Sequence, residues 1–416
     1  MNAYKTFRSL DTPTRYQLLI LFITALFFWT SITTLLPILP IYIEDLGGTK
    51  QQVGIVMGSF AIGLIFSRAW LGYLVDRRSR KLVITIGAFV AATAPLGYLV
   101  APAIPSLMVI RAYHGICVAA FATGYSTLVV DFSPIKQRGE IIGYMSLTAP
   151  LGMGIGPALG SVLQKSIDYE GLFLLSAGLG TMALLMNTRI REPSHKERLA
   201  RQQEESDNTP DRTFWQLFRE PALLVPTVIF FLAGTIFGGI ASFLPLFIRE
   251  ANLAFSAGAF YSYAAVSGVL GRIVSGGSSD RYGRGLFITA SLFSYALSMF
   301  LLIRASSPLE ITVAAIAEGA GGGILFPMLL ALISDRSRSG ERGRAYAICI
   351  GGFDVGTALA GPLLGVFEIG YRTMFTVSLG LAGVALFVFF TLSNKSIARS
   401  FRFAWGLDKD RYAIDL

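Results

Sequence analysis

The sequence predicts an all-α integral membrane protein with twelve transmembrane helices in two pseudo-symmetric bundles of six. Three observations predict this class: an apolar composition, twelve long apolar stretches, and a repeat between the two halves of the chain. Hydrophobic residues make up 53% of the 416 residues and charged residues only 15%, whereas soluble domains carry about 25% charge. This composition excludes a disordered chain. The presence of only two cysteines, Cys117 and Cys349, excludes a disulfide-stapled secreted scaffold.

A helix that crosses the hydrocarbon needs about 20 predominantly apolar residues. The first such stretch is longer than the apolar region of a signal peptide and lacks a small-residue cleavage site, so we expect it to be a retained helix. Twelve stretches meet the requirement, near residues 17–42, 52–75, 82–101, 105–130, 141–164, 171–188, 222–248, 256–279, 285–303, 309–334, 345–367 and 372–393.

The distribution of lysine and arginine predicts the orientation. With the N-terminus in the cytoplasm, 27 of the 35 basic residues fall in cytoplasmic segments and five in outer loops. We therefore expect both termini to be cytoplasmic. The net charge of +9 is then explained without a nucleic-acid partner. The charged stretch 189–221 is predicted to be a cytoplasmic linker between a bundle at 1–188 and a second bundle, with a short tail, at 222–416.

The two halves of the chain repeat each other at an offset of 204 residues. Arg68, Gly72, Asp76, Arg77, Arg80, Gly115, Asp131, Arg138 and Gly152 are matched by Arg272, Gly276, Asp280, Arg281, Arg284, Gly319, Asp335, Arg342 and Gly356. Parallel six-helix repeats are typical of transporters whose halves rock about a site near the middle of the membrane.

Four motifs resemble the major facilitator superfamily, and the resemblance covers nearly the whole chain. The segment from Gly72 to Lys81 is similar to the family's signature between helices 2 and 3, with Ser79 in place of the usual glycine. Arg111 to Gly115 resembles the helix 4 motif, and Gly152 to Ser161 resembles the antiporter-associated helix 5 motif, with Ser161 replacing its last glycine. The prolines of the segment 36–40 resemble those of bacterial drug:proton antiporters.

The resemblance implies that the loop signature and its repeat form a gate. Asp76 is expected to cap a neighbouring helix or to pair with a basic residue such as Arg138. The simpler alternative is that the arginines only anchor helix ends at the cytoplasmic surface. The expected gating residues are Gly72, Asp76, Arg77, Arg80, Gly276, Asp280, Arg281, Arg284, Arg138 and Arg342.

One face of the span 105–130 carries polar residues. Arg111 and His114 are three residues apart, and Tyr125 continues the same face. We expect this face to line the substrate cavity, where Arg111 could bind an anionic group or act on a nearby carboxylate. The alternatives are that backbone carbonyls satisfy Arg111 and that His114 is structural.

Glu318 and Asp354 are the two acidic residues well inside the spans. Proton-coupled transport needs a buried carboxylate, so both are candidates for coupling or substrate binding. Asp354 shares a helix face with Thr357, away from the small residues Gly352, Gly356 and Ala360. An ion pair between Arg111 and Glu318 is a further hypothesis. The alternative role for either carboxylate is structural pairing.

Glycine and proline in two spans predict bends and close helix packing. The residues concerned are Gly152, Gly156, Pro157 and Gly160 in one span, and Gly361 and Pro362 in another. No cluster has metal-ligand spacing, no phosphate-binding loop occurs, and no catalytic constellation is present, so we expect no metal, no cofactor and no enzymatic activity.

These observations predict a secondary transporter that works by alternating access. Export of a small organic solute against proton entry is the preferred interpretation, leaving open a proton symporter that imports a sugar or an organic acid, and a membrane sensor that transports nothing. We expect the protein to be monomeric and to lie in a bacterial inner membrane. The substrate cannot be read from the sequence.

Overall fold

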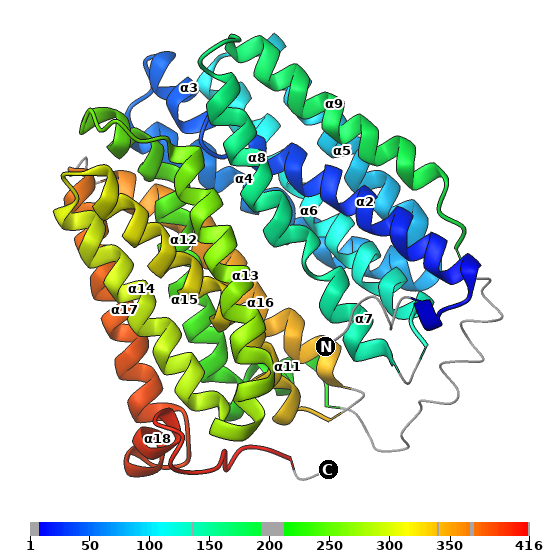
Figure 1. The fold of residues 1–416 in the computed structure, drawn as a ribbon, viewed down its shortest axis with the longest axis vertical. Coiled ribbons are helices and arrows are strands. Elements are labelled where there is room, and N and C mark those ends of the chain that lie inside the picture. The colour runs from blue at the N-terminus through cyan, green and yellow to red at the C-terminus, as the bar shows by residue number, and fades with distance from the viewer. Residues whose placement is uncertain (1–7, 135–136, 193–211, 339–340, 367–369, 415–416) are drawn as a thin grey trace. The chain divides into compact units, whose positions relative to one another are not determined.

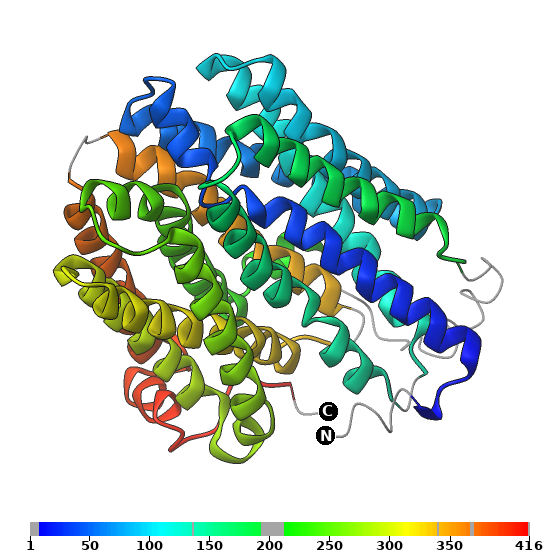
Figure 2. The ribbon, with the colours of Figure 1, turned by 45° about the horizontal axis from the view of Figure 1, so that its top comes forward.

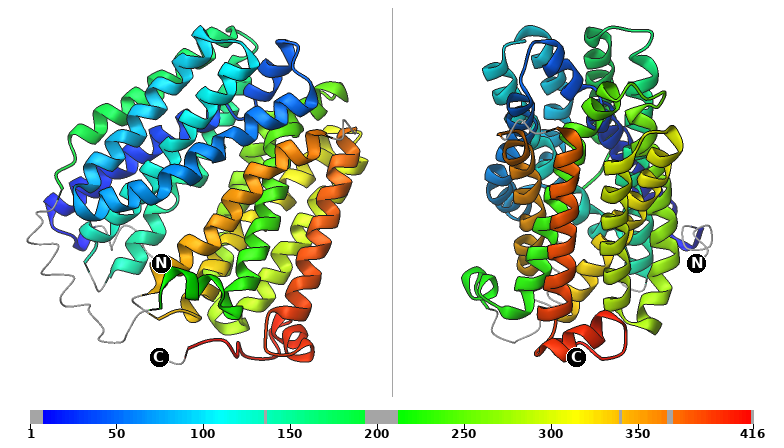
Figure 3. Two further views of the ribbon diagram at one scale, coloured as in Figure 1. Left: turned by 180° about the vertical axis from the view of Figure 1, so that it is seen from behind. Right: turned by 90° about the vertical axis from the view of Figure 1, so that its left-hand side faces the viewer.

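The computed structural model describes residues 8–134, 137–192, 212–338, 341–366 and 370–414, and within these ranges the chain is helical, without strands. The chain divides into two compact units, Met1–Glu205 and Ser206–Leu416. In Figure 1 the first unit runs from blue to green and the second from green to red, and Figure 2 and Figure 3 show the same helices from other sides. The all-α prediction is confirmed.

The first unit contains a bundle of long helices with two short ones. Its helices are α2 (Thr12–Thr34), α3 (Leu39–Asp45), α4 (Lys50–Arg77), α5 (Arg80–Val100), α6 (Ile104–Phe132), α7 (Arg138–Met145), α8 (Thr148–Leu163) and α9 (Tyr169–Thr188).

The second unit repeats the six spans as single helices, without the short α3 and α7, and adds a helix at each end. Its helices are α11 (Phe214–Phe218), α12 (Pro221–Glu250), α13 (Ala257–Tyr282), α14 (Arg284–Arg304), α15 (Pro308–Asp335), α16 (Arg342–Val366), α17 (Tyr371–Leu392) and α18 (Ile397–Ala404).

Eleven segments of the described chain are long and apolar enough to cross a membrane. The remaining predicted span, 256–279, corresponds to α13, which has 26 residues and is therefore long enough. This helix is more polar because it carries Arg272 and several serines, among them Ser267 and Ser275. The twelve-helix arrangement thus holds, with α13 as the least apolar member.

Prolines interrupt two of the predicted spans. The first span is divided into α2 and α3 around Pro37, which has no N–H to donate. The predicted span 141–164 is divided into α7 and α8 at Ser146 and Leu147, four and three residues before Pro150. Proline clashes with the carbonyl four residues earlier, which accounts for this position.

The helix breaks do not lie at the glycine–proline pairs named above. Helix α8 continues through Gly156 and Pro157, and α16 continues through Gly361 and Pro362. The bends predicted at these pairs remain a prediction, and the fifth span is interrupted nearer its start.

Glycines bring equivalent helix pairs into backbone contact in both units. A Cβ atom at Gly115 on α6 would lie 1.7 Å from the carbonyl oxygen of Phe60 on α4. A Cβ atom at Gly319 on α15 would lie 1.9 Å from the carbonyl oxygen of Ala264 on α13. Phe60 and Ala264 are themselves 204 residues apart, so the sequence repeat corresponds to one repeated helix contact.

A second glycine stripe joins α8 to α2. Cβ atoms at Gly152, Gly156 and Gly160 would lie within 2.3 Å of atoms of Trp29, Thr33 and Thr34, respectively. The Thr33 hydroxyl also donates to the carbonyl of Gly152 at 2.8 Å. On α16, Cβ atoms at Gly352 and Gly356 would lie 2.6 and 2.1 Å from backbone oxygens of α12. These glycines allow the helices to pack at backbone distance.

We predict that Gly115→Ala destabilises the protein, because the new methyl group must displace the backbone of α4. Overpacking of this kind costs about 1–3 kcal/mol. The matched control is Gly178→Ala on α9, where a Cβ meets nothing within 4 Å, so that only the better helix propensity of alanine acts. Thermal unfolding of the purified protein in detergent should show a lower midpoint for Gly115→Ala alone. Equal midpoints for the two variants would contradict the packing argument.

Candidate functional site

Arg111 and His114 form a buried cluster on α6 with residues of neighbouring helices. The side chains are 7% and 0% exposed. The Arg111 guanidinium lies 4.4 Å from the centroid of the Phe60 ring, an arrangement that stabilises a cation. The hydroxyl of Tyr98 lies 3.1 Å from Nδ1 of His114. Within the described ranges, Nε2 of His114 and Nε of Arg111 have no hydrogen-bond partner.

Tyr125, on the predicted cavity-facing stripe of α6, makes contacts within the first unit. The Tyr125 hydroxyl donates to the carbonyl of Met145 at 2.8 Å, and its ring lies 5.7 Å from that of Phe121. Met145 is the last residue of α7, so this bond fastens α6 to the helix break. The role of Tyr125 in a substrate cavity remains a prediction.

Glu318 lies in the interior of α15, near two tyrosines of neighbouring helices. Tyr261 and Tyr295 come from α13 and α14 and are close enough to Glu318 to interact with it electrostatically. The Tyr261 hydroxyl donates a hydrogen bond to the carbonyl of Ile240 at 3.3 Å. In the described part of the second unit, no cation forms an ion pair with Glu318.

Glu318 occupies the same repeat position as His114, since the two residues are separated by 204. Each therefore precedes the glycine at which its helix contacts the neighbouring helix, Gly115 or Gly319. Both units thus carry a titratable side chain at one equivalent place. Arg111 and Glu318 belong to different units, so the ion pair between them remains a prediction.

Asp354 is buried on α16, with 9% of its surface exposed. Thr357, predicted to share a helix face with Asp354, donates its hydroxyl to the carbonyl of Gly234 on α12 at 3.2 Å and to that of Phe353 at 2.9 Å. The close approach of α12 at Gly356 brings Thr357 within reach of that helix. Thr357 therefore belongs to the contact between α12 and α16.

An ion pair joins α5 to α6 at the loop signature of the first unit. Nε of Arg80 lies 2.9 Å from Oδ2 of Asp131, and the two side chains are 7% and 15% exposed. Glu192 binds the N-terminal end of α5, because its carboxylate accepts hydrogen bonds from the backbone N–H of Arg80 at 2.8 Å and from the Ser79 hydroxyl. A carboxylate at a helix N-terminus is favourable. Glu192 thus caps the start of α5.

The second unit has the same ion pair at the repeat positions. Nε of Arg284 lies 3.0 Å from Oδ2 of Asp335, with side chains that are 24% and 37% exposed. Here the chain after α17 covers the start of α14, where a Cβ at Gly285 would lie 2.0 Å from the carbonyl oxygen of Phe403. The two units therefore share the ion pair but protect it differently.

The remaining gating candidates are distributed over the same ends. The guanidinium groups of Arg77 and Arg281 lie 5.7 and 5.4 Å from the ring centroids of Tyr73 and Tyr282. A Cβ at Gly72 or Gly276 meets nothing within 4 Å. Arg138 and Arg342 are the first residues of α7 and α16. The side chains of Asp76 and Asp280 lie outside the described part, so their roles remain predictions.

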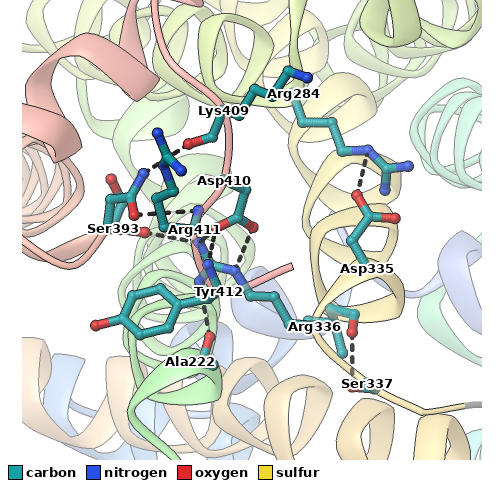
Figure 4. Close-up of polar contacts among 12 residues, drawn as sticks. Ala222, Arg284, Asp335, Arg336, Ser337, Ser393, Lys409, Asp410, Arg411 and Tyr412 are labelled. Carbon is teal, nitrogen blue, oxygen red and sulfur yellow. Dashed lines mark hydrogen bonds and ion pairs between the residues drawn. The ribbon is translucent and has the colours of Figure 1, made fainter. Parts of the chain in front are cut away.

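Arg336 is a site that sequence reasoning missed. Its side chain is fully buried and pairs with Asp410, with Nε 2.7 Å from Oδ2. It also donates to the carbonyls of Ala222 and Ser393 at 2.8 and 2.7 Å, as Figure 4 shows. The tail is held further by the bond from the Ile414 N–H to the carbonyl of Asp335 at 2.8 Å. The available signal was an arginine directly after the repeated aspartate, where the first unit has Phe132.

A second missed network joins the start of the described second unit to the loop before α16. Arg212 forms an ion pair with Glu341 at 2.7 Å and with Glu220 at 2.9 Å. Hydrogen bonds from Arg212 lower the pKa of Glu341 to about 2.

Over the described residues, no group of three histidine, cysteine, aspartate or glutamate side chains could hold a metal ion.

Comparison with known proteins agrees with this architecture. The sequence model described as Major Facilitator Superfamily matches residues 21–308 and 276–405. The quinolone resistance protein NorA of Staphylococcus aureus is 24% identical over 378 residues, covering 89% of this chain and 95% of NorA. The multidrug resistance protein MdtG of Escherichia coli is 27% identical over 399 residues, with 91% and 94% coverage. The crystal structure of the nucleoside transporter NupG superposes with a TM-score of 0.70 at 17% identity, covering 89% of this chain and 98% of NupG, and so shares the fold.

We predict that the two repeated ion pairs differ in their contribution to stability. Asp131→Asn leaves a buried guanidinium without its charge partner and should cost about 3 kcal/mol. Asp335→Asn breaks a more exposed pair and should cost about 1 kcal/mol or less. Thermal unfolding in detergent measures both variants, and a larger loss for Asp335→Asn would refute the assignment.

We predict that the stabilisation by Glu341 depends on pH. The pKa of this carboxyl is depressed in the folded state, so its contribution is complete above the unfolded value of about 4.3 and is lost as the pH falls toward the folded value near 2. The unfolding midpoint of Glu341→Gln should lie below that of the wild type at neutral pH, and the gap should close between about pH 4.5 and 2. Glu220→Gln, which removes only one contact to Arg212, is the control with a smaller gap.

Proposed function

Because the chain belongs to the major facilitator superfamily, we propose that it exports a small organic solute in exchange for protons by alternating access. The chain is a multi-pass membrane protein and a secondary transporter. We propose the proton coupling, the outward direction of transport and the location in a bacterial inner membrane. The lysine and arginine distribution supports cytoplasmic termini, and the bacterial relatives support an inner-membrane location. We also propose that the transporter acts as a monomer.

The environment of Glu318 is the observation that carries proton coupling. The residue lies ten residues into α15, or about 15 Å from its start by helical rise. An ionised carboxylate at such depth is costly unless it is paired or hydrated, and in the described part of the second unit no cation forms an ion pair with Glu318. A side chain in this setting takes up a proton when it is closed from water and releases it when water reaches it.

His114 supports a matching role in the first unit. It holds the equivalent repeat position, and its Nε2 has no partner among the described side chains. Asp354 is the second candidate carboxylate, buried on α16. We propose that Glu318 is the principal coupling residue and that Asp354 and His114 assist substrate or proton binding.

Two observations favour export. The relatives NorA and MdtG are named as quinolone and multidrug resistance proteins. The glycines of the helix 5 motif, which resembles that of antiporters, pack α8 onto α2. The proposed solutes are therefore amphipathic organic molecules of the kind that such relatives are named for.

The test uses purified protein in liposomes that contain a pH-sensitive dye and carry an imposed proton gradient. We predict that a quinolone or another amphipathic solute drives proton flux opposite to its own movement. Glu318→Gln should reduce coupled flux to background, while solute binding to the detergent-purified variant persists, because the amide cannot exchange a proton.

Glu310→Gln is the matched control on the same helix. The Glu310 carboxylate accepts from the backbone N–H groups of Ser306 and Ser307 at 2.7 and 3.0 Å, so it serves as a cap at the start of α15. Its replacement should leave coupling intact. Full coupling in Glu318→Gln and loss in Asp354→Asn would move the role to Asp354. Proton and solute movement in the same direction would overturn export.

A further inference from the structure

Helix α18 presents three distinct faces. Ser400, Phe403 and Ala404 are buried against the second unit. A second face carries Ile397, Phe401 and Trp405, which are 67%, 52% and 42% exposed. Because these three residues are four apart, they form one apolar stripe. Arg399 and Arg402 are exposed on the remaining face.

The apolar stripe continues the outer surface of a membrane-spanning helix. The ring of Phe390 on α17 lies 5.6 Å from that of Phe401 and 6.1 Å from that of Trp405. Phe387 and Leu392, in the last turns of the same helix, are 68% and 55% exposed. Figure 1 shows α18 at the end of α17. The stripe is therefore contiguous with a surface that faces acyl chains.

Contacts with the bundle hold α18 in this position. The Thr289 hydroxyl on α14 donates to the carbonyl of Ala404 at 2.9 Å, and the rings of Phe389 and Phe403 lie 6.0 Å apart. Beyond α18, Asp410 is fixed by the buried Arg336. The stripe cannot turn inward without breaking these contacts, so its exposure is built into the second unit.

The arginines of α18 are available to an external anion. In the described part of the chain, neither Arg399 nor Arg402 forms an ion pair. Two acids follow α18: Asp410 is paired with Arg336, and Asp408 accepts from the backbone N–H of Lys409. Arg402 donates to the carbonyl of Leu407 at 3.5 Å, which leaves its other donors for an anion. A cationic face beside an apolar, aromatic stripe matches the chemistry of an acidic headgroup joined to acyl chains.

We propose that α18 is an interfacial helix that binds anionic phospholipid. The side chains of Ile397, Phe401 and Trp405 enter the boundary between headgroups and acyl chains. Arg399 and Arg402 hold the lipid phosphate. Continuity with the lipid-facing surface of α17 favours lipid over a protein as the occupant of the stripe.

The test uses Trp405 as a reporter in the full chain. Phenylalanine replaces the other three tryptophans, Trp29, Trp70 and Trp215, and the protein is placed in nanodiscs whose lipids carry bromine on the acyl chains. Brominated phosphatidylglycerol should quench Trp405 more than brominated phosphatidylcholine at the same mole fraction. Arg399→Gln and Arg402→Gln should each lower this preference by about fivefold.

Arg304→Gln, an exposed arginine at the far end of α14, is the control and should leave the preference unchanged. Native mass spectrometry of the protein with all its tryptophans supplies a second measurement, in which the double arginine variant should retain less phosphatidylglycerol than the wild type. Equal quenching by both lipids would refute the anionic site. Absence of quenching would refute lipid contact altogether. Shielding of Trp405 that depends on protein concentration would instead assign the stripe to a second copy of the chain.

Discussion

The glycine contacts between α4 and α6 and between α13 and α15 are the constraint on which the other features depend. They bring two helices of each unit to backbone distance, at Gly115 and at Gly319. Each glycine directly follows the titratable residue of its helix, His114 or Glu318. Because side chains on a helix are fixed relative to the residues beside them, the packing contact also positions His114 and Glu318, the groups proposed to take part in proton coupling. Structure and proposed chemistry are therefore encoded at the same place in each repeat.

The repeat is preserved in its ion pairs but not in the groups that surround them. Arg80 with Asp131 and Arg284 with Asp335 keep the same spacing and nearly the same distance. Around them, the first unit uses Glu192 and the second uses the chain after α17. The pair in the first unit is more buried, so its charges depend more on one another. Two halves with a common element of unequal strength have a physical basis for unequal roles in a conformational cycle.

The sequence was sufficient to predict the class of fold, because spanning helices need long apolar stretches and little else produces them. The offset of 204 residues already contained the repeated Arg–Asp pairs, although only the arginines were interpreted as a gate. The helix break before Pro150 was missed because proline in a span can bend a helix or end it. The partners Glu192, Asp410 and Glu341 lie in segments whose charge suggests solvation. Composition alone does not distinguish a solvated charge from one that pairs with a distant buried arginine.

The burial of Arg336 explains why the end of the chain behaves as part of the second unit. A guanidinium without exposed surface requires partners for its donors, and the main chain at Ala222 and Ser393 provides two of them. These oxygens are neutral, so the charge still needs an anion, which Asp410 supplies from beyond α18. Removing that anion would leave an uncompensated buried charge, whereas removing an exposed charge on α18 would not. The ion pair between Asp410 and Arg336, which directly follows α15, therefore fixes the tail. Because α18 lies between α17 and Asp410 in the sequence, this ion pair also restricts the position of α18.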